Sequence, residues 1–207
     1  MSDYVTLQEL KNTLDAMQVN FFDYDAQMAI SAASRSVDEY CGRRFFTEGT
    51  FTRYYTARNL GGYPYGGQGY VDIDDLVTAS TVQTDWDGDG VLDTTWTQNT
   101  DYVLEPFNAA SVSKPYEVLR VNPRSSLRFP VYPRGVAVTG GWGWPAVPAQ
   151  VKEATTVLAI RFVRRAREAS FGVVSVGIDG QAVHIPRMDP DVGMMLSPLV
   201  KGCVMAA

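Results

Sequence analysis

The residues best suited to chemistry in this sequence are four aspartates in the stretch 84–96, TDWDGDGVLDTTW. They occupy positions one, three, five and nine of a calcium-binding loop: Asp85, Asp87, Asp89 and Asp93. Gly90 falls at position six, where such a loop turns sharply, but position twelve is Trp96 and not the required bidentate glutamate. The two Asp-Gly pairs also suit the tip of a β-hairpin. We therefore expect a hairpin, with calcium binding as the alternative hypothesis.

Other catalytic or cofactor motifs are missing from the sequence. The chain has one histidine, His184, and no phosphate-binding glycine loop, nucleophile elbow or zinc-binding His-Glu-x-x-His pattern. Its two cysteines, Cys41 and Cys203, do not form a Cys-x-x-Cys pair, and we expect both to be reduced thiols. The sequence thus predicts a protein that is not an enzyme and binds no cofactor.

Aromatic residues raise a further alternative, a glycan-binding face. Tyr63, Tyr65 and Tyr70 belong to a glycine-rich loop, whereas Trp142 and Trp144 alternate in Gly-Gly-Trp-Gly-Trp-Pro. Alternate residues of a strand point to one side, where two indoles could stack on a sugar or pack in a core. We favour core packing for the tryptophans. A calcium- or glycan-binding β-module remains the alternative function.

Helices are predicted near both ends of the chain. Thr6 and Glu9 match a capping box that opens a first helix, and a second helix is expected from after Asp23 to a stop at Gly42. A third helix is expected over residues 147–168, with a buried face made by Val151, Thr155, Leu158 and Phe162.

The intervening residues predict a sheet. Aromatic and β-branched runs alternate there with Gly, Pro and Asn, which indicates antiparallel strands joined by turns. The predicted fold class is α+β: a helical core formed by residues 1–44 and 145–170, an inserted antiparallel β-rich domain at 45–144, and an extended C-terminal arm at 171–207.

The arm is apolar, although it shows no sustained helical or strand period. Its many aliphatic residues cannot all remain in water, so we expect the arm to lie on a surface of its own or of a neighbour. Arginines at the end of the third helix suit the negative end of the helix dipole, and contact with an acidic partner is the alternative. The residues expected at a partner interface are Arg164, Arg165, Ile185, Met188, Asp189, Asp191, Met194, Met195 and Leu196.

The charge and hydropathy of the chain limit its partners. Eighteen basic and 23 acidic residues give a net charge of −5, which does not favour electrostatic binding to DNA but is compatible with a conduit for DNA. No apolar run reaches the ~20 residues that cross a bilayer, and no signal-peptide pattern opens the sequence. We expect a protein of the cytoplasm that does not enter a membrane.

Three segments resemble the head-tail adaptor proteins of long-tailed bacteriophages, also called head completion or connector proteins. Residues 29–46, an Ala-rich stretch ending in Tyr-Cys-Gly-Arg-Arg-Phe-Phe, resemble the second helix of that family. Residues 136–168 resemble its strand, Gly-Trp-Pro turn and following helix, and residues 189–199, DPDVGMMLSPL, are similar to its usual ending. Together the segments cover about a third of the 207 residues, in the order of the family.

This resemblance implies a structural virion protein without enzymatic activity. Such adaptors assemble as a ring, commonly dodecameric, beneath the portal, where they extend the DNA channel and present a surface to the next joining protein on the stopper or tail-terminator side. The implied partners are further copies of the chain, the portal and that tail-side protein, and DNA passes without sequence-specific binding. The implied location is the head–tail junction of the virion, after assembly in the host cytoplasm.

Overall fold

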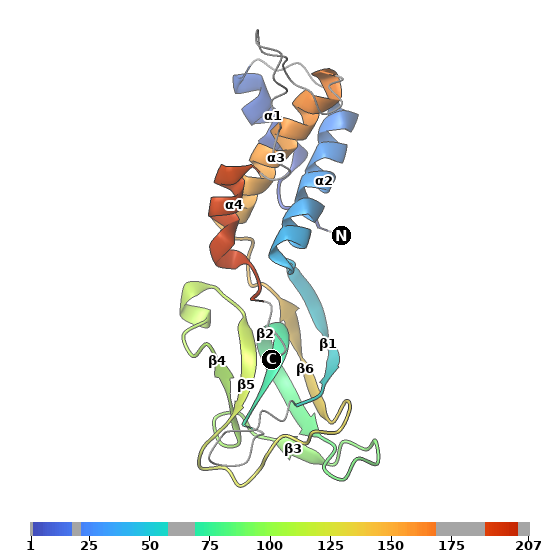
Figure 1. Ribbon diagram of the computed structural model, residues 1–207, viewed down its shortest axis with the longest axis vertical. Coiled ribbons are helices and arrows are strands. Elements are labelled where there is room, and N and C mark those ends of the chain that lie inside the picture. Colours follow the sequence, from blue (N-terminus) through green and yellow to red (C-terminus); the bar gives the residue numbers. More distant parts are fainter. Residues whose placement is uncertain (1, 18–21, 58–68, 169–188, 203–207) are drawn as a thin grey trace, which may run out of the picture. The chain divides into compact units, whose positions relative to one another are not determined.

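The computed structural model describes residues 2–17, 22–57, 69–168 and 189–202. They divide into two compact units: a helical unit formed by Met1–Phe45 and Val147–Ala207, and a β unit formed by Phe46–Ala146. The predicted α+β class, with helices and an antiparallel β-rich domain, is confirmed (Figure 1). Within the described ranges, each helix is either too short or too polar to span a bilayer.

The described part of the helical unit contains four α-helices and a 3-10 turn. They are α1 (Leu7–Ala16), α2 (Asp23–Cys41), α3 (Ala149–Glu168), α4 (Pro190–Leu196) and η2 (Ser197–Leu199). Helix α3 packs against α1, α2 and α4, so it is the central element of the unit. Buried alanines on α2 and α3, such as Ala33 and Ala159, allow the backbones to approach closely.

The helix ends follow the sequence signals. The Glu9 N–H donates to the Thr6 hydroxyl, and the Thr6 N–H donates to the Glu9 carboxylate at 2.7 Å, so the predicted capping box is confirmed. Helix α2 stops at Gly42, whose φ of +64° lies in the left-handed region that glycine adopts without strain.

The C-terminal arm differs from its predicted extended form at residues 190–199, which are helical. Asp189 caps α4 by accepting a hydrogen bond from the Asp191 N–H, and Pro190 occupies the first turn, where its missing N–H has no cost. Val192 and Leu196, one turn apart, are fully buried because α4 packs on α3. The remaining arm residues, 171–188 and 203–207, lie outside the described residues.

The β unit is a sheet in which each pair of named strands is antiparallel. The strands are β1 (Thr47–Tyr55), β2 (Tyr70–Thr84), β3 (Thr94–Trp96), β4 (Tyr102–Glu105), β5 (Tyr116–Val121) and β6 (Val136–Gly143), with a 3-10 turn η1 (Ala110–Val112) before β5. The order is β1-β6-β2-β5-β4, and β3 pairs with β2 beside it. The first and last strands of the unit are therefore neighbours, which brings its two chain ends together.

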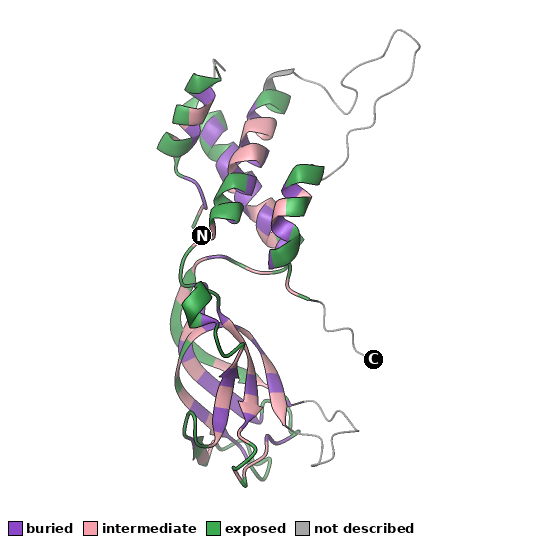
Figure 2. Cartoon of the chain, turned by 90° about the vertical axis from the view of Figure 1, so that its left-hand side faces the viewer, coloured by how far each residue is buried: buried purple, intermediate pink, exposed green. Residues whose placement is uncertain are grey.

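Aliphatic and aromatic side chains together fill the core of this sheet, in which buried and less buried residues alternate along the strands (Figure 2). The rings of Trp96 and Phe129 stack at 4.4 Å, and the Trp142 side chain is fully buried. A Cβ atom on Gly140 would lie 2.1 Å from the Thr78 carbonyl oxygen, so glycine is required where β6 meets β2. Close strand packing therefore explains the glycines of the Gly-Gly-Trp-Gly-Trp segment.

Candidate functional site

The acidic loop between β2 and β3 brings three of the four candidate calcium ligands together. Carboxylate oxygens of Asp85, Asp87 and Asp89 lie within 4.8 Å of one another, and Asp93 is not part of this group. Asp87 and Asp89 are exposed, whereas only 5% of Asp85 is exposed. The structure therefore brings together three of the four carboxylates that the sequence pattern predicted.

The buried carboxylate of Asp85 holds the loop itself. Its two oxygens accept hydrogen bonds from the N–H groups of Gly88, at 2.7 Å, and Gly90, at 2.9 Å. Both glycines have positive φ values, +81° and +91°, as the tip of a hairpin requires. The favoured turn-forming role therefore accounts for Asp85 without a metal ion.

The two tryptophans that could have formed a glycan-binding face are core residues. Trp142 is fully buried, and its indole N–H donates to the Phe51 carbonyl at 2.8 Å. Trp144 is also buried and donates to the Asp75 carboxylate at 2.9 Å. Tyr70 is partly exposed under the Arg120 guanidinium, and Tyr63 and Tyr65 lie outside the described residues. The favoured core role of the tryptophans is thereby confirmed.

Predicted partner residues meet at the end of α3 and on α4. Arg161 lies 3.7 Å from the carboxylate of Asp189, the residue that caps α4. Arg164 and Arg165 are exposed one turn further along α3, and within the described ranges neither makes an ion pair. Among the residues that the structure describes, this end of the unit therefore presents two guanidinium groups without an ion pair.

The remaining predicted interface residues divide by exposure. Met194 is 73% exposed, Asp191 is exposed and Met195 is half-buried. Leu196 is a correction, because its side chain is fully buried in the helical unit and is not available to a partner. The other two, Ile185 and Met188, lie outside the described residues, as does the single histidine, His184.

An apolar surface on α2 was not predicted from the sequence. Tyr24 and Met28, one turn apart, are 74% and 56% exposed, and Phe22 just before the helix is 70% exposed. They lie away from the buried face that contains Ala26 and Ile30. The signal was present as an apolar pair at i and i+4 on the side opposite the alanines.

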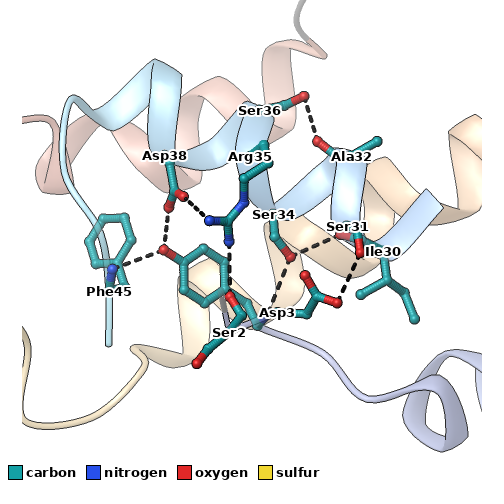
Figure 3. A network of polar contacts seen from close by, with 11 residues as sticks. Ser2, Asp3, Ile30, Ser31, Ala32, Ser34, Arg35, Ser36, Asp38 and Phe45 are labelled. Atoms are coloured by element: carbon teal, nitrogen blue, oxygen red, sulfur yellow. Dashed lines mark hydrogen bonds and ion pairs between the residues drawn. The ribbon is translucent and has the colours of Figure 1, made fainter. Parts of the chain in front are cut away.

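A polar network fastens the first residues of the chain to α2 (Figure 3). The Tyr4 hydroxyl donates to the Asp38 carboxylate and accepts a hydrogen bond from the Phe45 N–H at 2.9 Å, and the Tyr4 N–H donates to the Ser34 hydroxyl at 3.2 Å. Arg35 pairs with Asp38 at 3.0 Å. The three hydrogen bonds of Tyr4 join residues 30 or more positions apart, so no local pattern could reveal them.

Burial sets the chemistry of this network. Desolvation is the main reason that the pKa values of Tyr4 and Asp38 are raised, and it also raises the pKa of the nearby Cys41 thiol to about 11. A thiol with such a pKa carries almost no thiolate at neutral pH and is a poor nucleophile. The network is therefore suited to holding the fold and not to catalysis.

Comparison with known proteins finds similarity in structure but none in sequence. No protein-family model matches the chain, and no curated protein matches its sequence. Its structure is similar to a chain in the neck of an empty gene transfer agent (GTA) particle computed with C6 symmetry, with a TM-score of 0.56 and 14% identity over 99% of this chain and 93% of that chain. At that identity the match shows a shared fold.

Two further solved structures have lower scores. A chain in the neck of the native GTA particle, computed with C12 symmetry, has a TM-score of 0.49 and 16% identity over 100% of this chain and 97% of that chain. A chain in the virion of the native GTA particle has a TM-score of 0.48 and 16% identity over 89% of this chain and 92% of that chain.

Proposed function

We propose that this chain is a structural protein of the neck of a phage-like particle, where it forms a ring at the head–tail junction. The observation that carries the proposal is the fold shared with a chain of a GTA particle neck, along 99% of this chain. Independent support comes from the residues that resemble head-tail adaptors, because they lie in both units and keep the order of that family.

The ring would sit beneath the portal, extend the DNA channel and present its far side to a tail-side joining protein. The net charge of −5 suits a conduit that DNA passes through without binding. The neck to which the fold is similar was computed with C6 symmetry, and a ring of six or twelve identical subunits satisfies that symmetry. The resemblance to adaptors favours twelve.

A structural role without catalysis is supported by the way the described polar groups are used. The carboxylates of Asp38 and Asp85 accept hydrogen bonds that fix the N-terminal segment and the acidic loop. Both clusters hold backbone in place, which is what a rigid assembly component needs.

Mixing the purified full chain with portal rings of the same particle, followed by electron microscopy, tests the proposal. We expect an added ring of density on one end of the portal, with rotational symmetry in end-on views. Portals that remain bare when the chain is in excess would show that the proposal is wrong.

A surface variant shows whether the exposed side of α4 contributes to assembly of the ring on the portal. Deletion of the whole arm after Ser170 is not suitable for this test. It would remove the buried residues Val192 and Leu196 and so damage the helical unit. Met194→Glu changes only an exposed side chain, and Val112→Glu, at an exposed position of the β unit, is the matched control. We expect Met194→Glu to weaken decoration of the portal and Val112→Glu to leave it unchanged.

A further inference from the structure

We infer that copies of this chain join head to tail through two surfaces of the helical unit, the α2 face of one copy against the α3–α4 face of the next. The α2 face is Tyr24, Asp25 and Met28. The α3–α4 face is Arg164, Arg165 and Met194. The inference rests on the proposed ring and names the side chains that would form it.

The α2 face is an apolar patch with an acidic edge. Tyr24 and Met28 are more than half exposed and occupy successive turns of the helix, and Phe22 adds a third exposed apolar side chain at the same end. Asp25 is exposed between them in sequence, whereas Asp23 is paired with Lys11 at 2.7 Å. Neighbouring exposed apolar side chains, unlike scattered ones, mark a contact surface.

The α3–α4 face carries two arginines, of opposite charge to Asp25, and one exposed aspartate, Asp191, and it has a similar apolar component. The contact between Arg161 and the Asp189 cap shows that this side of α3 faces α4. Arg164 and Arg165 follow Arg161 by three and four residues, so they lie on the same side of α3. Met194 projects from α4 and is 73% exposed. Methionine packs on varied apolar surfaces, and the guanidinium groups can pair with Asp25.

The two faces lie on different sides of one unit. Helix α3 packs against both α2 and α4, which flank it in Figure 1. A contact between two different surfaces repeats from copy to copy and closes into a ring when its rotation permits. A contact of either face with itself would bring like charges together and would stop at a dimer. Charge complementarity therefore favours the head-to-tail contact.

Thiol crosslinking of the full chain tests the contact. In a Cys203→Ser background, Cys41 is buried and has a raised pKa, so it does not react with maleimides at neutral pH. Met28→Cys and Met194→Cys are introduced together and treated with a short bismaleimide at high protein concentration. We expect a ladder of covalent oligomers extending beyond the dimer, because each copy supplies one thiol of each kind.

The single variants decide between contact types. Met28→Cys alone and Met194→Cys alone should remain monomeric, and so should a control that combines Met28→Cys with Val112→Cys. Dimers from Met28→Cys alone would mean that α2 meets α2, and the absence of a ladder from the double variant would mean that the two faces do not meet; each result overturns the inference.

Charge reversal gives a second, independent readout. Arg164→Glu with Arg165→Glu should abolish the ladder, while circular dichroism shows the helices intact, and adding Asp25→Lys should restore at least part of it. A ladder unaffected by the reversal would show that the arginines do not form the contact. Rings on the portal without these crosslinks would overturn only the inference, whereas crosslinks with bare portals would overturn only the proposed function.

Discussion

The Tyr4 hydroxyl donates a hydrogen bond to the carboxylate of Asp38, 34 residues further along the chain. The same hydroxyl accepts the Phe45 N–H, so Tyr4→Phe would remove both hydrogen bonds. We expect this variant to lose about 1–3 kcal/mol of unfolding free energy. Urea denaturation followed by circular dichroism measures the loss. Tyr24→Phe, at an exposed tyrosine, should change stability by less than about 0.5 kcal/mol; equal effects would contradict the structural role of Tyr4.

The capping box at the start of α1 makes stability depend on pH. Hydrogen bonds from the Thr6 N–H and then the Thr6 hydroxyl lower the pKa of Glu9 below its usual 4.5. The stabilisation is therefore present above pH 4.5 and is lost as the pH falls through the lowered pKa of the folded state. Glu9→Gln keeps an acceptor but has no charge, so it should be less stable than the natural chain by roughly a few tenths of a kcal/mol at neutral pH.

The difference in stability between the natural chain and Glu9→Gln should shrink in acid. Thermal unfolding of both proteins between pH 7 and pH 3 measures it. The two curves should begin to converge below pH 4.5, the usual pKa of this carboxyl, and should meet only below its lowered pKa in the folded state. A gap that stays constant down to the lowest pH would show that the charge of Glu9 is not involved.

Asp85 should be the one aspartate of the acidic loop that matters for stability. Asp85→Ala removes the acceptor of two backbone N–H groups, and we expect a loss of about 1–3 kcal/mol. Asp87→Ala, at an exposed position of the same loop, should be nearly neutral. Hydrogen exchange at Gly88 and Gly90 should accelerate in the first variant alone, and similar behaviour of the two variants would contradict the assignment.

Calcium should not bind tightly to this loop. Both oxygens of Asp85 already accept backbone hydrogen bonds, and Asp93 does not join the group of three carboxylates. Calorimetric titration of chelator-treated protein should show no binding heat at millimolar calcium. Saturable heat that disappears in Asp87→Ala would instead support the calcium-binding alternative.

Gly140 should tolerate no side chain. A Cβ atom at this position would overlap the Thr78 carbonyl, so Gly140→Ala must push β6 away from β2, at a cost of at least about 1–3 kcal/mol. Gly69→Ala is the control, because a Cβ atom there meets nothing within 4 Å. Soluble yield and melting temperature should fall for Gly140→Ala and stay unchanged for Gly69→Ala.

Features set by local chemistry could be predicted from the sequence. The Thr6–Glu9 capping box, the Gly42 stop and the glycines of the acidic loop depend on residues a few positions apart, and the structure contains each of them. Residues 94–105 form two short strands, β3 and β4, and Asn99 between them has a φ of +66°.

Features that depend on tertiary packing were missed or could not be seen. Helix α4 carries a recognisable start, an aspartate cap followed by proline, but its seven residues become stable by burying Val192 and Leu196 against α3. The exposed pair Tyr24 and Met28 on α2 has an ordinary sequence signature. The burial of the alanine-rich face of α2 shows that this pair lies on the exposed side of the helix.

The closure of the β unit by its own first and last strands has a consequence for the evolution of the gene. The backbone N–H of Trp144 donates to the Phe46 carbonyl at 3.2 Å, and the Thr47 hydroxyl donates to the Trp144 carbonyl at 3.0 Å. The chain therefore enters and leaves the β unit at nearly the same point. A segment with joined ends can be lengthened, shortened or exchanged while its attachment stays the same. Recombination at residues 46 and 146 would therefore exchange the β unit and leave the sequence of the helical unit unchanged.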